Sequence, residues 1–356
     1  MPQPQTGISK ADLIAAMNGH EATNNWDVMC CYRETELNSL LQQKYSQGKL
    51  VADITFKAVY HDPLFDQDIT IDVDLKLREP QLSFEFNTRS TCKLTMPILG
   101  GTYTMSSSDG KTIKYDIPPD VLQVICTVPL GAMSGDTQEV HDGTKPIIFD
   151  NASPVTQHIC LHFKNTDMTV FDVIPMAGKD DKAKTIPLYN ENVQPVIIEQ
   201  IKYFFQTQVS EIDYAVGSLS NTTKPGVLTV TPKSFIFVQC KPNENADGSL
   251  NLYIQTDNSK NPQGDLTPSF QPGGTAIPSI PDGYSASLIL SNDFMQNSFF
   301  TSQLNKDGWT TVPQATAQGI VYHLTKNEKI HVPGVSQMGR DQQHSDDVNI
   351  DFNTTP

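Results

Sequence analysis

Two histidines and one cysteine occupy alternate positions in the chain, at His158, Cys160 and His162. Alternate residues of a β-strand share one face, so these side chains would present the nitrogen and sulfur ligands that zinc prefers. Neighbours on one face are nevertheless about 7 Å apart, which is too far for adjacent ligands to converge without unusual twisting and a fourth ligand. We therefore interpret them as solvent-facing strand residues and predict no metal site.

A second group of possible ligands consists of carboxylates on two neighbouring segments, Asp53, Asp66, Asp68, Asp72 and Asp74. Calcium needs several oxygen atoms that converge from a tight loop. Strand alternation would instead spread these carboxylates along a solvated face. A charged outer face that discourages association between sheet edges is the interpretation that we favour.

The signatures of common enzyme classes are missing from the chain. It contains no GxxxxGK, no GxGxxG after a strand, no HExxH and no GxSxG. His61 and Asp62 are adjacent, as are His141 and Asp142, but no nucleophile lies near either pair in the sequence. We therefore expect a protein that is not an enzyme and has no cofactor.

The charge balance of the 356 residues limits the possible partners. The formal net charge of -15 argues against nucleic acid, because phosphate binding draws its affinity from clustered Lys and Arg. It also disfavours adsorption to an anionic membrane. No secretory signal and no transmembrane segment is visible, so we expect a cytoplasmic protein, with release by a non-classical route left open. The six cysteines form no CxxC pair and are expected to be reduced.

The clearest structural signal is the alternation of apolar and polar residues from Asp68 to Arg78. It predicts one long strand with five side chains on a core and its carboxylates in water. Val51–Tyr60 is expected to pair with it as a long hairpin. The inward-facing residues would be Ile69, Ile71, Val73, Leu75 and Leu77.

Helical spacing of apolar residues predicts helices at Lys10–Gly19, Thr35–Tyr45, Val193–Tyr214 and Asp293–Leu304. The Val193–Tyr214 helix is the longest and has a broad apolar stripe. Such a stripe indicates core packing, or else one wall of an apolar tube for an acyl chain. The helix residues that would contact such a chain are Ile197, Ile201, Phe204, Phe205, Phe294, Phe299 and Phe300.

Further short strands, bounded by Gly, Pro, Asn and Asp, predict a mainly antiparallel β protein with a few helices. We divide it into a polar leader with a short helix (1–24), one elongated domain (25–333) and a polar tail (334–356). Residues 258–283 are rich in Pro and Gly and are expected to form a long surface loop. Gly319–Thr325 is predicted to be the last strand.

Three passages resemble one family of proteins. Asn25–Tyr32, with its Trp-Asp pair and the helix that follows, resembles the opening motif of that family. Pro281–Ser291, which runs into Phe294, resembles a later one, and Met96–Tyr103 resembles a third. The family comprises the OrfX-type and forty-seven-kilodalton accessory proteins of clostridial neurotoxin gene clusters, which are members of the tubular lipid-binding (TULIP) superfamily. The resemblance spans about residues 25–330.

The resemblance implies an α+β fold in which a long, strongly curved antiparallel sheet wraps around a long amphipathic helix. It also implies binding of lipids or phosphoinositides and an accessory role beside a toxin. We therefore expect a non-enzymatic lipid-binding or lipid-surface-binding protein. A protein-interaction module with a fully packed core and no lipid is the alternative, and an enzyme or metal-binding protein is a second one.

Overall fold

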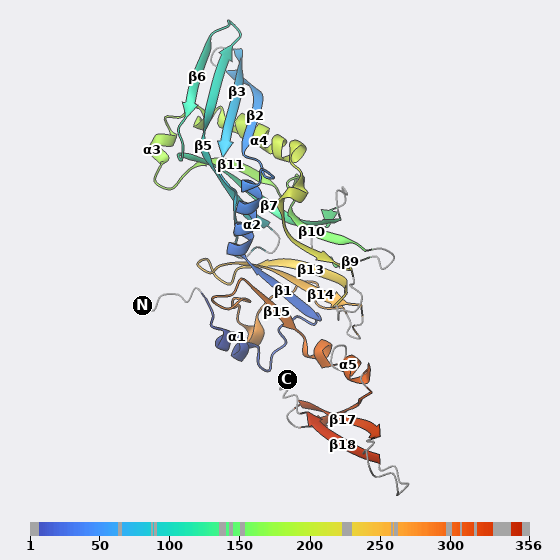
Figure 1. Cartoon of the computed structure of the whole chain (residues 1–356). Coiled ribbons are helices and arrows are strands. Elements are labelled where there is room, and N and C mark those ends of the chain that lie inside the picture. Colours follow the sequence, from blue (N-terminus) through green and yellow to red (C-terminus); the bar gives the residue numbers. More distant parts are fainter. Residues whose placement is uncertain are drawn as a thin grey trace, which may run out of the picture.

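The computed structural model describes residues 7–62, 66–86, 88, 91–134, 140–141, 145–149, 154–222, 230–257, 259, 263–296, 301–306, 308–316, 319–329 and 343–350. Their strands form three antiparallel sheets, and the molecule is elongated (Figure 1). The mainly antiparallel β fold with a strongly curved sheet, predicted from the sequence, is confirmed.

The largest sheet has ten strands and bends around the helix α4 (Gln194–Gln208) (Figure 1). Six strands form its main path in the order β12-β10-β7-β5-β3-β2, and four others pair at its sides. The strands are β2 (Asp53–Asp62), β3 (Gln67–Leu77), β4 (Gln81–Phe84), β5 (Thr91–Ser107), β6 (Thr112–Ile117), β7 (Leu122–Ser134), β8 (Val140–His141), β10 (Thr156–Leu161), β11 (Val170–Pro175) and β12 (Ala215–Ser220).

β5 is the strand that joins the two halves of this sheet. Its first half pairs with β4 and β7, and its second half pairs with β3 and β6. The change of partners occurs at Gly100 and Gly101. Both have a backbone φ of +144°, a value that residues other than glycine rarely adopt. These two glycines belong to the third family-like passage, so that motif builds the bend of the sheet.

A five-stranded sheet packs beside the large one, in the order β15-β1-β14-β13-β9. Its central strands are buried on both faces. The inner face joins the main hydrophobic core, and the outer face forms a second cluster around Trp26 and Tyr253. The strands are β1 (Val28–Arg33), β9 (Ile147–Ile148), β13 (Pro232–Cys240), β14 (Ser249–Thr256) and β15 (Ala286–Leu290).

The Trp-Asp pair of the first family-like motif closes this second cluster. The indole Nε1 of Trp26 donates to the carbonyl oxygen of Asp265 at 2.9 Å. The carboxylate of Asp27 is fully buried and accepts hydrogen bonds from the backbone N–H of Thr256 at 2.7 Å and from the hydroxyl of Ser259 at 2.7 Å. Both residues therefore act in the architecture of the fold.

The Pro-rich stretch over 263–282 covers this outer face together with α1 (Lys10–Met17). It contains only the short turn η3 (Pro272–Gly274), but Phe270 and Ile280 are buried in it. Its apolar side chains complete the second cluster, and Leu13 of α1 contributes from the N-terminal side. The segment 7–24 therefore packs onto the fold.

Three helices begin within one residue of the predicted positions. In the stretch predicted as the fourth helix, residues 292–296 are helical and Thr301–Lys306 forms α5, whereas 297–300 lie outside the described residues. α2 (Glu34–Ser46) includes Thr35 inside the helix, where its hydroxyl donates to Asp247 at 3.1 Å. α4 ends at Gln208 because Val209 adopts an extended conformation, so the prediction of one helix to Tyr214 is wrong. The remaining helical segments are α3 (Asp180–Ala183), η1 (Pro187–Tyr189), η2 (Glu211–Tyr214) and α5 (Thr301–Lys306).

The third sheet lies near the C-terminal end, in the order β16-β17-β18. Its strands are β16 (Thr310–Thr316), β17 (Gly319–Lys329) and β18 (Gln343–Ile350). The prediction that Gly319–Thr325 is the last strand is therefore wrong, because β17 continues to Lys329 and β18 follows within the segment predicted to be a polar tail. The sequence of β18 shows little alternation of apolar and polar residues, so hydrophobic periodicity does not predict this strand. β18 forms through backbone pairing with β17.

Candidate apolar binding surface

The inner face of the hairpin strands, defined here as the face toward α4, is apolar along its length. The antiparallel register places Ile71 between Ala58 and Met105. Residues that face one another across strands point to the same side, so alternate residues form one continuous surface. Ile71 and Leu75 are fully buried, which confirms the alternation predicted for β3.

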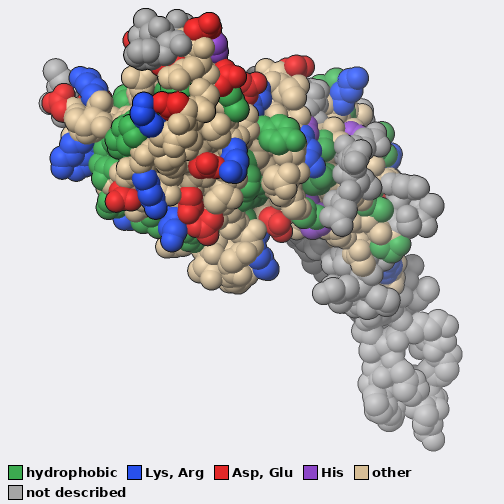
Figure 2. All heavy atoms as spheres, turned by 90° about the horizontal axis from the view of Figure 1, so that it is seen from above, with side chains coloured by type: hydrophobic (Ala, Val, Ile, Leu, Met, Phe, Trp, Pro, Cys, Tyr) green, Lys and Arg blue, Asp and Glu red, His purple; other side chains and the backbone are tan. Residues whose placement is uncertain are grey.

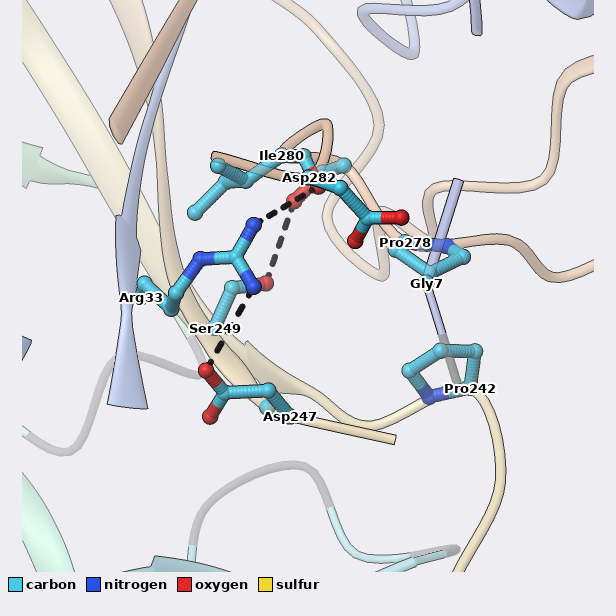
Figure 3. Close-up of a pocket in the computed structure, with 10 residues that line it drawn as sticks. Gly7, Arg33, Pro242, Asp247, Ser249, Pro278, Ile280 and Asp282 are labelled. Carbon is cyan, nitrogen blue, oxygen red and sulfur yellow. Dashed lines mark hydrogen bonds and ion pairs between the residues drawn. The ribbon is translucent and has the colours of Figure 1, made fainter. Parts of the chain in front are cut away.

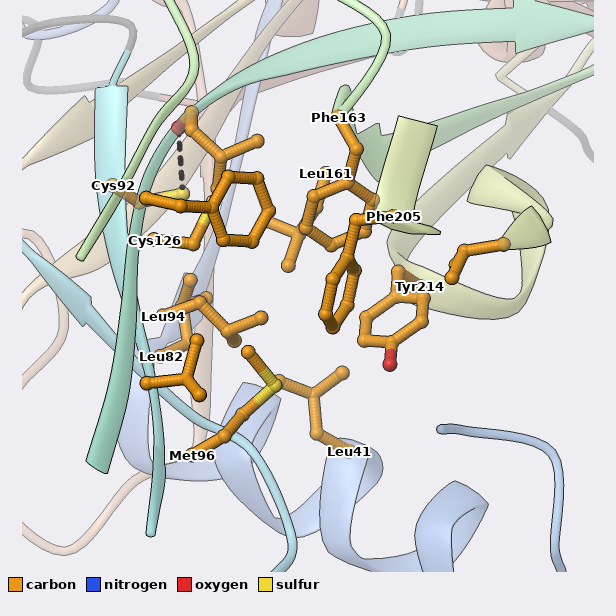
Figure 4. Close-up of a cluster of buried hydrophobic side chains, with 14 of the residues drawn as sticks. Leu41, Leu82, Cys92, Leu94, Met96, Cys126, Leu161, Phe163, Phe205 and Tyr214 are labelled. Carbon is orange, nitrogen blue, oxygen red and sulfur yellow. Dashed lines mark hydrogen bonds between the residues drawn. The ribbon is translucent and has the colours of Figure 1, made fainter. Parts of the chain in front are cut away.

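α4 covers the part of this face nearest the five-stranded sheet. Ile197, Ile201 and Phe205 recur every four residues, face the core and are fully buried. The ring centroid of Phe205 lies 5.1 Å from those of Phe163 and Phe171. Figure 4 shows Phe205 between Phe163 and Tyr214 in this packed group. Protein side chains therefore surround these three predicted lipid-contacting residues, and their contact with lipid stays a prediction.

The same inner face continues beyond the packed region toward the tips of the two hairpins. There its side chains are only partly buried, and Ile113 of β6 is 55% exposed. We call this surface the apolar rim; it consists of Tyr60, Ile69, Met105, Ile113 and Tyr115. The rim is an apolar surface that is open to solvent and continuous with the core.

One buried polar group adjoins the rim. Tyr103 is fully buried, and its ring centroid lies 6.1 Å from that of Tyr115. Its hydroxyl has no hydrogen-bond partner among the described residues, and burial raises its pKa to about 12. A buried hydroxyl without a partner costs free energy that a polar group of a ligand could recover.

The outer face of the same strands is polar, as the sequence predicts. Lys57 and Asp72 form an ion pair at 2.9 Å across β2 and β3. Val59 is an exception, because it is apolar and 59% exposed on this outer face. Figure 2 looks at the molecule from above and shows acidic and basic side chains interspersed with hydrophobic ones. Charges of both signs therefore occur on the face of the molecule seen from above in Figure 2.

The remaining predicted lipid-contacting residues lie elsewhere. Phe204 is partly buried against the core on α4, and Phe294 is buried in the short helical stretch at 292–296 that follows β15. Phe299 and Phe300 lie outside the described residues. Neither Phe204 nor Phe294 is therefore part of the apolar rim.

Sequence reasoning missed most of the rim. Ile69 lies in a strand that the sequence predicts, whereas β6 was not predicted. The sequence of β6 nevertheless alternates between polar residues and the apolar Ile113, Tyr115 and Ile117. That alternation was the available signal. It could not have told which of these residues α4 leaves uncovered.

Cys160 is only 2% exposed, so the prediction that His158, Cys160 and His162 face solvent is wrong for the thiol, and the three side chains do not converge as metal ligands. His162 instead approaches the carboxylate of Glu211, with Nδ1 3.0 Å from Oε1, and Glu211 also accepts from the N–H of Lys164 at 2.8 Å. Burial alone would raise the pKa of Glu211, but the hydrogen bonds from His162 and Lys164 hold it below its ordinary value. Desolvation raises the pKa of the Cys160 thiol to about 12, so it stays protonated.

A small pocket surrounds Arg33, as Figure 3 shows. The guanidinium donates to the carbonyl oxygens of Ile280, Pro281 and Tyr284 at 2.8–3.2 Å and pairs with Asp247 at 3.5 Å. The cavity volume of about 10 Å³ is the space of a single water molecule. Arg33 therefore links the loop before β15 to the sheet. Most of its guanidinium hydrogen-bond donors are used in these contacts, so few remain to bind a phosphate group.

Two further properties concern membranes and metals. None of the helices in the described ranges is long and apolar enough to cross a membrane. Within the same parts of the chain, no three His, Cys, Asp or Glu side chains converge as ligands for a metal ion. All six cysteines are free thiols.

Comparison with known proteins gives a match at the level of structure. No protein-family model and no curated protein matches the chain. P47 of Clostridium botulinum E1 superposes with a TM-score of 0.51 and 15% identity, over 92% of this chain and 67% of P47. P47 from Clostridium botulinum A2 gives 0.48 and 14%, over 88% and 68%. A lipopolysaccharide binding protein gives 0.29 and 12%, over 86% and 71%. The match to P47 of the E1 type confirms the fold that the family resemblance implies.

Proposed function

We propose that this protein, with its P47-like fold, is a non-enzymatic lipid-binding protein that contacts acyl chains through the apolar rim. The observation that carries the proposal is the continuity of the rim with the core. The inner face of β2, β3, β5 and β6 remains apolar after α4 stops covering it. An exposed apolar surface of this kind marks an interaction site.

The size of the rim suits reversible binding to a lipid surface. Full burial of one large apolar side chain contributes about 1.5–3 kcal/mol. Since four of the five rim residues are already partly buried and Ile113 is exposed, they can together contribute several kcal/mol on binding. The net charge of -15 opposes approach to anionic lipids. Zwitterionic lipid is therefore the expected ligand class, in preference to phosphoinositides.

Vesicle flotation with two matched variants tests this proposal. Ile113→Asp places a charge in the rim, and Val59→Asp places one on the outer face at nearly the same exposure. We expect wild type and Val59→Asp to float with phosphatidylcholine vesicles, and Ile113→Asp to stay in the dense fractions. Circular dichroism and melting temperature check that all three proteins are folded. Absence of flotation for wild type, or equal flotation of the two variants, would refute lipid binding at the rim.

Mass spectrometry of a solvent extract of the purified protein gives an independent readout. Lipid retained in stoichiometric amount by wild type, and reduced in Ile113→Asp, is the expected result.

Association with a toxin component, implied by the family resemblance, is a second candidate function. The observation that favours a protein partner is the edge of the five-stranded sheet at β15, which pairs only with β1 in the described ranges.

A further inference from the structure

β15 forms an open edge of the five-stranded sheet. Among the residues that the structure describes, it pairs only with β1. The backbone N–H of Arg33 donates to the backbone carbonyl oxygen of Ser285 at 3.1 Å. The backbone N–H of Ser291 donates to the backbone carbonyl oxygen of Asp27 at 2.9 Å. In an antiparallel pair, the residues bonded to the partner alternate with residues whose N–H and C=O point away. The outward-pointing backbone groups of β15 are therefore those of Ala286, Leu288 and Leu290.

The edge lacks the features that normally protect an exposed strand. Natural edge strands carry charged residues, Pro or a bulge that prevents pairing with another chain. The sequence of β15 is Ala-Ser-Leu-Ile-Leu, and its register with β1 is regular. Leu288 in its centre is 64% exposed, and Tyr284 just before it is 49% exposed. The edge is therefore uncharged, apolar and competent to pair.

A hollow of about 330 Å³ lies beside this edge. Leu288 faces Cys30 across the two strands, and Ala286 faces Tyr32. These four side chains share one face of the sheet, since they are two residues apart on each strand. The hollow is lined by Cys30, Cys31, Tyr32, Ala286, Ser287 and Leu288. An apolar side chain from a strand laid along β15 would lie on this face and could enter the hollow.

We propose that β15 binds an extended segment of a partner protein as an added β-strand, with an apolar residue of that segment in the hollow. Strand addition of this kind draws affinity from main-chain hydrogen bonds and specificity from pockets for alternate side chains. Both elements are present here. The rim lies on the other sheet, so this inference does not depend on lipid binding.

The charges around the edge define the partner further. Asp282 precedes the strand and Asp293 follows it, and both are exposed. An extended segment with an apolar centre and Lys or Arg at both ends therefore complements the edge. A second copy of this chain fits poorly. Antiparallel pairing of two copies about Leu288 would bring Asp293 of each toward Asp282 of the other, and each chain has a net charge of -15.

A designed peptide with the sequence KKTVTLTVTKK serves as the probe, measured by fluorescence anisotropy against the full chain. The control peptide, EETVTLTVTEE, reverses the terminal charges. We expect the basic peptide to bind at least about tenfold more tightly than the acidic one. Hydrogen exchange should also slow at the amides of Ala286, Leu288 and Leu290 when the basic peptide binds.

Two variants at one position test the mode of binding. Leu288→Pro removes an outward N–H that makes no bond to β1, a position where an edge strand tolerates proline. Leu288→Val keeps that N–H. We expect Leu288→Val to bind the peptide and Leu288→Pro to lose at least about tenfold in affinity at unchanged melting temperature. If Leu288→Pro does unfold, the exchange protection of wild type decides the question.

Three results would overturn the proposal. The first is failure of wild type to bind the basic peptide. The second is equal binding by Leu288→Pro and Leu288→Val in the folded state. The third is a wild-type dimer in sedimentation that Leu288→Pro converts to monomer, because the occupant of the edge would then be a second copy.

Discussion

The backbone of Gly264 lies against the indole ring of Trp26, so closely that a Cβ atom at Gly264 would be 2.3 Å from Cδ1 of the ring. The indole in turn donates its hydrogen bond to Asp265, the next residue. A contact across 239 positions of sequence therefore holds the Pro-rich stretch onto the outer face of the five-stranded sheet.

Gly264→Ala is expected to lower the free energy of unfolding, because the added methyl group must displace the buried Trp26. Overpacking of this kind typically costs about 1–3 kcal/mol. Gly217→Ala is the control, since a Cβ there would meet its nearest atom at an ordinary 3.5 Å. Urea denaturation followed by circular dichroism and tryptophan fluorescence measures both. Equal stabilities of the two variants would show that the packing around Trp26 adapts freely.

Gly101→Ala is expected to disrupt the bend in β5. The residue has φ +144°, and a Cβ would lie 2.0 Å from the carbonyl oxygen of Asp74 on the neighbouring strand. The substitution combines conformational strain with a backbone clash, so we expect a loss above about 2 kcal/mol. Gly110→Ala isolates the conformational part, because Gly110 has φ +85° and open space around it. Thermal melts of the pair should show the larger loss at Gly101.

Glu211→Gln is expected to destabilise the protein at neutral pH but not in acid. The pKa of Glu211 is lower in the folded state than its ordinary value of 4.5, so its contribution is present above about that pH. It is lost as the pH falls through the folded-state pKa, because the carboxylate is then protonated in both states. A buried hydrogen bond to a charged group contributes about 1.5–3 kcal/mol. Unfolding free energies of both proteins from pH 7 to pH 3 test whether the difference shrinks.

Tyr103→Phe is expected to leave stability unchanged or to raise it by up to about 1 kcal/mol. The substitution removes a buried hydroxyl that has no hydrogen-bond partner in the part of the chain that the structure describes, so it removes a desolvation cost and leaves the ring in place. Chemical denaturation of the lipid-free protein is the measurement. A clear destabilisation would reveal that the hydroxyl has a partner in solution. If a rim-bound lipid bonds to this group, the variant should also retain less lipid.

Hydrophobic periodicity predicts secondary structure best for elements with one buried face and one solvent-exposed face. β3 satisfies this condition, and its inward residues were correctly identified from alternation alone. The α4 stripe likewise predicts an apolar helix face but leaves core packing and acyl-chain contact as alternatives, and the structure buries Ile197, Ile201 and Phe205 among protein side chains. The end of α4 at Gln208 was missed, because Val209 and Ile212 continue the apolar spacing although the backbone leaves the helix.

The sequence by itself determined the class of fold, because alternation and helical spacing are local consequences of backbone geometry. The resemblance of Asn25–Tyr32 to a family motif was also present in the sequence, whereas the role of Trp26 in packing came from the structure. Only the tertiary structure decided which apolar residues remain in contact with water. Ile71 and Ile113 belong to equally apolar stretches, yet α4 and its neighbours bury the first and leave the second 55% exposed. The tertiary structure also decided that β15 is an edge strand. A strand is at an edge when no second strand pairs with it, and the strands of this sheet come from distant parts of the chain.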